Sequence, residues 1–111
     1  MKINDCVHES YQNALEKGWW EENRSVGELI ALMHSELSEA LEEHRNGHSV
    51  EEVYYNDNKP NKPEGVAVEL ADCVIRVFDF CGRYDIDLES ILKLKMEYNS
   101  TRPYRHGNKV I

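Results

Sequence analysis

The sequence is poor in cysteine, with three residues at positions 6, 73 and 81 and no Cys-x-x-Cys pair. An odd number without such a pair argues against a disulfide framework. The first ten residues also lack the apolar stretch of a secretory signal peptide. These absences predict a reducing, cytoplasmic setting, in which Cys73 and Cys81 serve as small buried apolar residues.

Other shortages exclude further classes of protein. No apolar run approaches the roughly 18 residues needed to cross a membrane, so we expect no membrane association. Six glycines and three prolines are too few for a fibrous or disordered chain. Basic residues are outnumbered, because 13 Lys and Arg face 21 Asp and Glu and give a formal net charge of -8. Such a balance argues against nucleic acid as a partner.

A helical pattern is present over a chain of 111 residues, which we expect to form one domain, residues 1–111. Apolar spacing and end signals predict helices over residues 4–17, 26–46, 66–84 and 88–101. Ser25, with Glu28 three positions later, matches a capping box before the second helix. Residues 47–64 are predicted as loop with a short helical turn at 50–54, and the tail from 104 as extended. We expect no strand, hence an all-α class with four to five helices in a bundle that a partner subunit completes.

A carboxylate falls within the apolar face of the second predicted helix. At about 100° per residue, Glu36 lies between Leu29, Met33 and Ala40, and Glu39 lies at the edge of this face. Helices that face a core normally place their charges on the opposite side. An unpaired buried carboxylate is costly, so Glu36 is expected to take up a proton or to find a partner.

The third predicted helix is apolar almost all round, except for one polar stripe. Glu69, Asp72, Arg76 and Asp79 fall within a single sector of roughly 80°, among mainly valine, leucine, isoleucine and phenylalanine. A helix of this kind is usually buried on nearly every side. The stripe must therefore face a polar partner, although Arg76 can also pair with Asp72 and Asp79 within its own helix, in a structural role.

Antiparallel packing of these two helices would bring Glu36 and Glu39 opposite Glu69 and Asp72. Four converging carboxylates repel one another and raise some of their pKa values unless a cation lies among them. Hard oxygen ligands without nearby Cys or His favour Mg²⁺, with Mn²⁺ as a substitute, over Zn²⁺ or copper. The alternative is that each acidic pair is a solvated helix face.

The fourth predicted helix presents a cation, an amide and a guanidinium on one face, at Lys95, Asn99 and Arg102. Lys offers a point charge and Arg paired hydrogen bonds, which together suit the oxygens of an oligophosphate. The alternative is an exposed helix end that favours its own dipole. Four apolar residues of this helix are expected to serve the core: Ile91, Leu92, Leu94 and Tyr98.

Four stretches carry a resemblance over most of the chain: "KGWWEENR", "HSELSEALEEHR", "KPEGVAVELADCVIRVFDF" and "KMEYNSTRPYRHG". In them the chain resembles the MazG-like all-α nucleoside triphosphate pyrophosphohydrolases. The resemblance implies that Glu36, Glu39, Glu69 and Asp72 bind Mg²⁺, that a nucleotide is cleaved between its α and β phosphates, and that the chain forms dimers or tetramers. The 29 residues between Glu39 and Glu69 lie at or slightly beyond the upper end of the family's usual spacing.

The mechanism that this resemblance implies gives catalytic roles to Glu36 and Glu39, with Glu39 orienting or deprotonating the attacking water. The phosphate chain of the substrate would be held in line by the row on the fourth helix. Trp19 and Trp20 are candidates for stacking on the nucleobase, or else core residues. By resemblance alone, His106 is expected near the phosphates.

Two alternatives from other classes are open. A carboxylate-bridged di-iron bundle needs Glu-x-x-His on two helices, and neither Glu36 nor Glu69 has a histidine three residues on. A non-enzymatic helical oligomerisation or regulatory module could keep the acidic cluster as a metal-dependent latch. That module predicts stabilisation by Mg²⁺ without turnover of any nucleotide.

Overall fold

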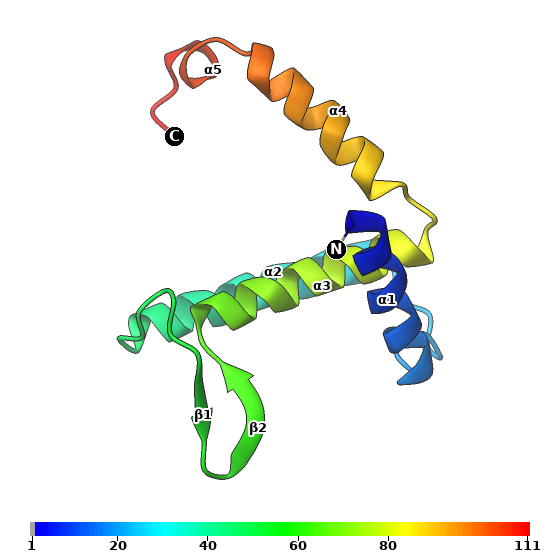
Figure 1. Ribbon diagram of the computed structural model, residues 1–111, viewed down its shortest axis with the longest axis vertical. Coiled ribbons are helices and arrows are strands. Elements are labelled where there is room, and N and C mark those ends of the chain that lie inside the picture. The colour runs from blue at the N-terminus through cyan, green and yellow to red at the C-terminus, as the bar shows by residue number, and fades with distance from the viewer. Residues whose placement is uncertain (1) are drawn as a thin grey trace.

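The computed structural model describes residues 2–111 and is mostly helical, as the sequence predicts, with one small antiparallel sheet (Figure 1). None of the helices formed by these residues is both long and apolar enough to cross a membrane. The elements follow in the order α1 (Ile3–Glu16), α2 (Val26–Arg45), β1 (Tyr54–Asn56), β2 (Lys59–Glu64), α3 (Val66–Arg83), α4 (Leu88–Thr101) and α5 (Arg105–Asn108).

The ends of α2 are set by local chemistry. The Ser25 hydroxyl accepts from the backbone N–H of Glu28, and the Glu28 carboxylate accepts from the backbone N–H of Ser25, which confirms the predicted capping box. Beyond the other end, Gly47 has a φ of 90°, a conformation that glycine adopts without steric cost. These signals fix which residues α2 contains, and therefore which direction each carboxylate takes.

Helices α2 and α3 run antiparallel and side by side, and α1 packs across the C-terminal part of α3 (Figure 1). Gly82 permits that crossing, because a Cβ at this position would collide with the Tyr11 side chain. The core is small. Among the described residues the buried apolar ones are Val7, Ala14, Ala40 and Cys81.

The hairpin of β1 and β2 corrects the prediction that residues 47–64 are loop without strands. The predicted helical turn is limited to a turn at residues 50–51, and Tyr54 already belongs to a strand. Tyr54 pairs with Glu64, and Asn56 with Lys59. Two prolines fit here because each strand of a two-stranded ribbon has an edge that needs no N–H donor. The hairpin extends away from the helices (Figure 1).

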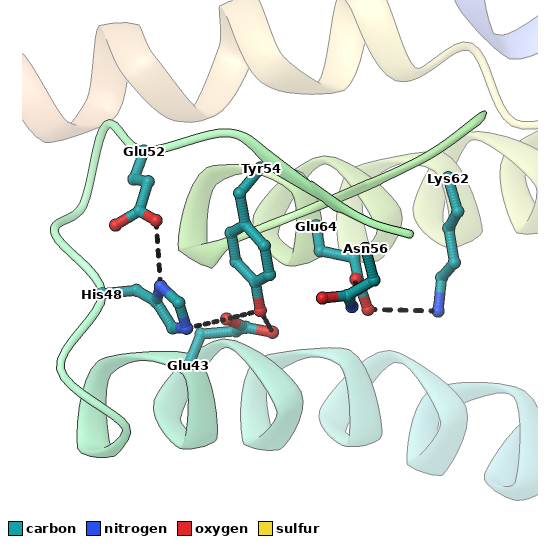
Figure 2. A network of polar contacts seen from close by, with 7 residues as sticks. All are labelled: Glu43, His48, Glu52, Tyr54, Asn56, Lys62 and Glu64. Atoms are coloured by element: carbon teal, nitrogen blue, oxygen red, sulfur yellow. Dashed lines mark hydrogen bonds and ion pairs between the residues drawn. The ribbon is translucent and has the colours of Figure 1, made fainter. Parts of the chain in front are cut away.

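A polar network fastens the base of the hairpin to α2 (Figure 2). The Tyr54 hydroxyl donates to the Glu43 carboxylate, at 2.7 and 2.9 Å from its two oxygens. The His48 ring stacks on the Tyr54 ring with centroids 4.3 Å apart, and its Nδ1 lies 3.1 Å from Oε2 of Glu52. Beside them, Lys62 pairs with Glu64. The segment between the two acidic motifs therefore contains a hairpin that polar contacts join to α2.

Helix α4 leaves the other helices and extends away from the α2–α3 pair (Figure 1). It begins beside α1, where the Asn4 amide donates to Asp87 and accepts from the backbone N–H of Glu89. The four apolar residues predicted to serve the core are exposed instead. Their exposed fractions are Ile91 52%, Leu92 39%, Leu94 66% and Tyr98 56%.

The tail after α4 also differs from its prediction as extended chain. Residues Arg105–Asn108 form a single turn, labelled α5, in which Arg105, His106 and Asn108 have positive φ values. Positive φ is uncommon outside glycine, and it breaks the regular helix within this turn. His106 consequently lies on an irregular turn near the end of the chain, and this turn, α5, is distant in space from α2 and α3 (Figure 1).

Candidate metal centre and adjoining pocket

Three carboxylates from α2 and α3 converge between the helices. Glu36, Glu69 and Asp72 each offer an oxygen, and these atoms lie within 4.8 Å of one another. Glu36 and Glu69 are each only 8% exposed, which places two acids in the interior of the helix pair. The antiparallel packing expected from the sequence is what brings them together.

Glu39 lies at the exposed rim of this cluster. The pKa of Glu69 is raised to about 8, first by burial, then by the nearby Glu39 carboxylate, and further by Glu36 and Asp72. The pKa of Asp72 is also raised, by burial and by the charge of Glu36. The other three predicted acids thus all act on Glu69, with Glu36 buried, Asp72 half-buried and Glu39 exposed.

Glu69 carries the clearest sign that a partner belongs in the cluster. Its Oε2 is fully buried and has no hydrogen-bond partner among residues 2–111. Buried polar atoms are nearly always paired, since an unsatisfied one costs about 1–3 kcal/mol. A carboxylate oxygen accepts protons or binds cations, and a set of hard oxygen donors fits Mg²⁺ or Mn²⁺. The residues present therefore fit a divalent cation.

Arg76 has a different partner from the two that the sequence suggested. Its Nε donates to Oε1 of Glu36 at 2.8 Å, across the helix pair, in place of the expected ion pairs with Asp72 and Asp79. Burial favours the neutral form of Glu36, but the hydrogen bond and charge of Arg76 contribute to lowering the pKa of Glu36 overall. Arg76 lies one turn after Asp72 on α3, so its contact places a positive charge beside the cluster.

A pocket of about 320 Å³ opens beside the cluster, between α1, α2 and α3. Glu36, Asp72 and Arg76 form one end of its wall. The remaining lining residues are Ser10, Asn13, Ala14, Trp19, Trp20, Arg24, Leu29, Leu32, Ile75 and Asp79.

Both tryptophans that the sequence proposes as base-binding residues line this pocket. The indole N–H of Trp20 donates to Oδ1 of Asp79 at 2.8 Å, and Trp19 is 61% exposed. Arg24, which sequence patterns did not single out, lies over the Trp19 ring at 5.9 Å from its centroid. Its proximity to Trp19 in the "WWEENR" turn was the only available signal.

The predicted phosphate-binding row does not reach the cluster within one chain. Lys95, Asn99 and Arg102 lie on α4 and just after it, on the part of the chain that extends away from α2 and α3 (Figure 1). The cations of Lys95 and Arg102 instead lie near the Tyr98 ring, 4.9 and 5.7 Å from its centroid. A second chain is needed if this row is to meet a phosphate bound at the acids.

The arrangement combines a cluster suited to a divalent cation with an adjoining pocket that has aromatic and charged walls. With a divalent cation in the cluster, such a pair could hold the anionic end of a ligand at the cluster and its uncharged end in the pocket. Comparisons with protein-family models, with curated proteins and with solved structures found no match to this chain.

Proposed function

We propose that this protein is a Mg²⁺-dependent nucleoside triphosphate pyrophosphohydrolase, which cleaves between the α and β phosphates to give a nucleoside monophosphate and pyrophosphate. One observation carries the proposal above all. A buried oxygen of Glu69, which has no hydrogen-bond partner in the described part of the chain, lies in a carboxylate cluster that borders a nucleoside-sized pocket. The resemblance in the "HSELSEALEEHR" and "VELAD" stretches supports the same assignment.

Glu36, Glu39, Glu69 and Asp72 are the residues that would hold the cation. When bound, Mg²⁺ would supply positive charge that offsets both the carboxylates and the phosphate oxygens. Glu39 is suited to take the proton of the attacking water, because its position at the exposed rim leaves it open to solvent and substrate. Water adds to phosphorus as the bond to the bridging oxygen breaks, and pyrophosphate leaves.

Arg76 would position Glu36. The hydrogen bond to Oε1 would hold this carboxylate in one orientation and does not involve its second oxygen, Oε2. Positioning of this kind matters because phosphoryl transfer depends mainly on geometry and electrostatics. Trp19 and Trp20 would border the nucleoside in the pocket.

The homodimer or homotetramer that the sequence predicts would complete the phosphate site. Apolar side chains on α3 that do not line the pocket remain exposed in one chain, with Leu70 at 46% and Val74 at 47%. Helix α4 presents a second exposed apolar surface and carries Lys95, Asn99 and Arg102. Packing between copies would cover both surfaces and would bring this row to the acids of a neighbour.

A panel of ordinary and modified nucleoside triphosphates, incubated with Mg²⁺ or with chelator, tests the proposal by release of monophosphate and pyrophosphate. Glu69→Gln should lower the rate by about a hundredfold or more. Glu42→Gln is the matched control, since the Glu42 side chain lies on α2 and, within residues 2–111, pairs only with exposed Arg45. A Glu69→Gln enzyme working at the wild-type rate would refute the assignment.

The same panel separates the alternatives. A rise in melting temperature with Mg²⁺, without turnover of any triphosphate, would identify the non-enzymatic latch. Bound iron with a visible absorption band would identify the di-iron centre instead.

A further inference from the structure

The pocket beside the carboxylates runs along α3 from Asp72 to Asp79. These residues are seven positions apart, which corresponds to about 10 Å along a helix axis. That span resembles the reach of a nucleotide from its α phosphate to the far edge of its base. With phosphates at the acidic end, the base would therefore lie beside Asp79.

Asp79 is held in one orientation at this far end. The Trp20 indole donates to Oδ1 at 2.8 Å, and Trp20 is the only hydrogen-bond partner of this carboxylate among residues 2–111. The Trp20 ring is itself fixed by an edge contact with Tyr11 and by Arg83, which lies 4.8 Å from its centroid. The second oxygen, Oδ2, remains available to a ligand in the pocket.

Two cationic side chains also line the pocket, and the positive charge of one of them, Arg76, acts on Asp79. Arg76 donates to Glu36, and Arg24 lies over the Trp19 ring. An ionised carboxylate only accepts hydrogen bonds. A group that meets Oδ2 of Asp79 must consequently be a donor, and a carbonyl oxygen in its place would be repelled.

We propose that Asp79 selects nucleobases that present an exocyclic amino group, cytosine or adenine, over the oxo analogues uracil and hypoxanthine. Cytosine carries an amino group where uracil carries a carbonyl, and adenine and hypoxanthine differ in the same way. Asp and Glu accept well from the cytosine amino group. This inference rests on the proposed function, because it uses the acidic cluster to orient the nucleotide.

Binding of nucleoside monophosphates tests the inference without any turnover. Titration calorimetry in Mg²⁺ compares CMP with UMP and AMP with IMP, and tryptophan fluorescence reports occupancy, since both tryptophans of the chain line the pocket. In at least one pair, the amino member should bind roughly 5- to 150-fold more tightly.

Asp79→Asn should remove that preference, because an amide can turn its NH₂ toward a carbonyl. Asp85→Asn is the matched control, an exposed residue just beyond α3 that does not line the pocket, and it should keep the preference. Trp20→Phe removes the indole N–H that donates to Asp79 and should weaken the preference. This second variant tests the inference if Asp79→Asn fails to fold.

Equal affinities within both pairs, or a preference for the amino member that persists in Asp79→Asn, would overturn the inference. Triphosphate hydrolysis with equal affinities would leave the proposed function standing and remove only the base selection. Selective binding of the amino member without hydrolysis of any triphosphate would support the base selection and contradict the proposed function.

Discussion

Glu69 ties the stability of the protein to pH. Its pKa is raised to about 8 in the folded chain from an ordinary value of 4.5. Between these two pH values Glu69 keeps its proton in the folded chain and has lost it in the unfolded chain. The free energy of unfolding therefore falls as pH rises from 4.5 to about 8. This loss of stability is absent below pH 4.5 and complete above about pH 8.

We therefore predict that the melting temperature of the metal-free protein decreases between pH 4.5 and about 8 through Glu69. Glu69→Gln removes the ionisable group, so its melting temperature should depend less on pH and should exceed that of the wild type at pH 8. Circular-dichroism melts in chelator measure this. Parallel pH profiles for the two proteins would contradict it.

Arg76 should stabilise the folded chain through Glu36. The hydrogen bond of 2.8 Å joins a Glu36 side chain that is 11% exposed to an Arg76 side chain that is 41% exposed. Solvent therefore weakens this ion pair only in part. We expect Arg76→Gln to lower the free energy of unfolding by about 1–2 kcal/mol in metal-free protein. Urea unfolding measures this loss.

Arg45→Gln provides the comparison for Arg76→Gln. Arg45 meets Glu42 at 3.6 Å, with side chains 70% and 60% exposed, and such surface pairs contribute little. Equal effects of the two substitutions would show that the Arg76 contact is no more than a surface pair.

The sequence predicted the acids of the site but not all of their partners. The direction of Glu36, Glu69 and Asp72 follows from the period of a helix, which is a local property. The partner of Arg76 depends on how far α2 and α3 are shifted along one another, and periodicity within one helix contains no such information. The Trp20 bond to Asp79 depends likewise on where α1 crosses α3.

The hairpin depends on Tyr54 for its attachment to α2. The Tyr54 hydroxyl donates to Glu43, whose carboxylate raises the pKa of Tyr54 to about 12. We predict that Tyr54→Phe lowers the free energy of unfolding by about 1 kcal/mol and speeds hydrogen exchange in residues 54–64. Exchange measured by mass spectrometry locates the change.

Tyr55→Phe is the matched control for this substitution, because Tyr55 is the neighbouring residue and is 56% exposed. It should leave exchange in the hairpin unaltered. Exchange that is equally fast in both variants would contradict an anchoring role for the Tyr54 hydroxyl.

Helix boundaries were predictable because their signals are local, as the Ser25 cap and the end of α4 before Pro103 illustrate. The strands were missed because Pro60 and Pro63 argue against a strand, and two-stranded ribbons tolerate them at their free edges. The direction of α4 was also missed. Its apolar residues indicated a buried face, but no local signal says whether the same chain or another one covers it.

The chain as a whole is extended for its length. Its radius of gyration is 16.7 Å, against about 13 Å for a compact domain of this size. Exposed apolar residues lie on both α3 and α4. We therefore propose that these surfaces are buried against another copy of the chain, which would add stability that so small a core does not supply.

We predict a dimer or tetramer in solution that Leu94→Gln weakens. Leu94 is 66% exposed in one chain, and losing its burial at an interface should raise the dissociation constant about tenfold or more. Lys93→Gln, at the preceding position of α4, should leave the dissociation constant nearly unchanged. Sedimentation analysis over a range of concentrations gives both values, and a monomer throughout would contradict the prediction.

A titration with Mn²⁺ followed by electron paramagnetic resonance tests directly whether the buried acids hold a divalent cation, because bound and free Mn²⁺ give different signals. The wild type and Glu42→Gln should bind the ion, Mg²⁺ should displace it, and Glu69→Gln should lose most of the binding. Binding that is absent from the wild type, or that survives unchanged in Glu69→Gln, would contradict a cation site at Glu36, Glu69 and Asp72.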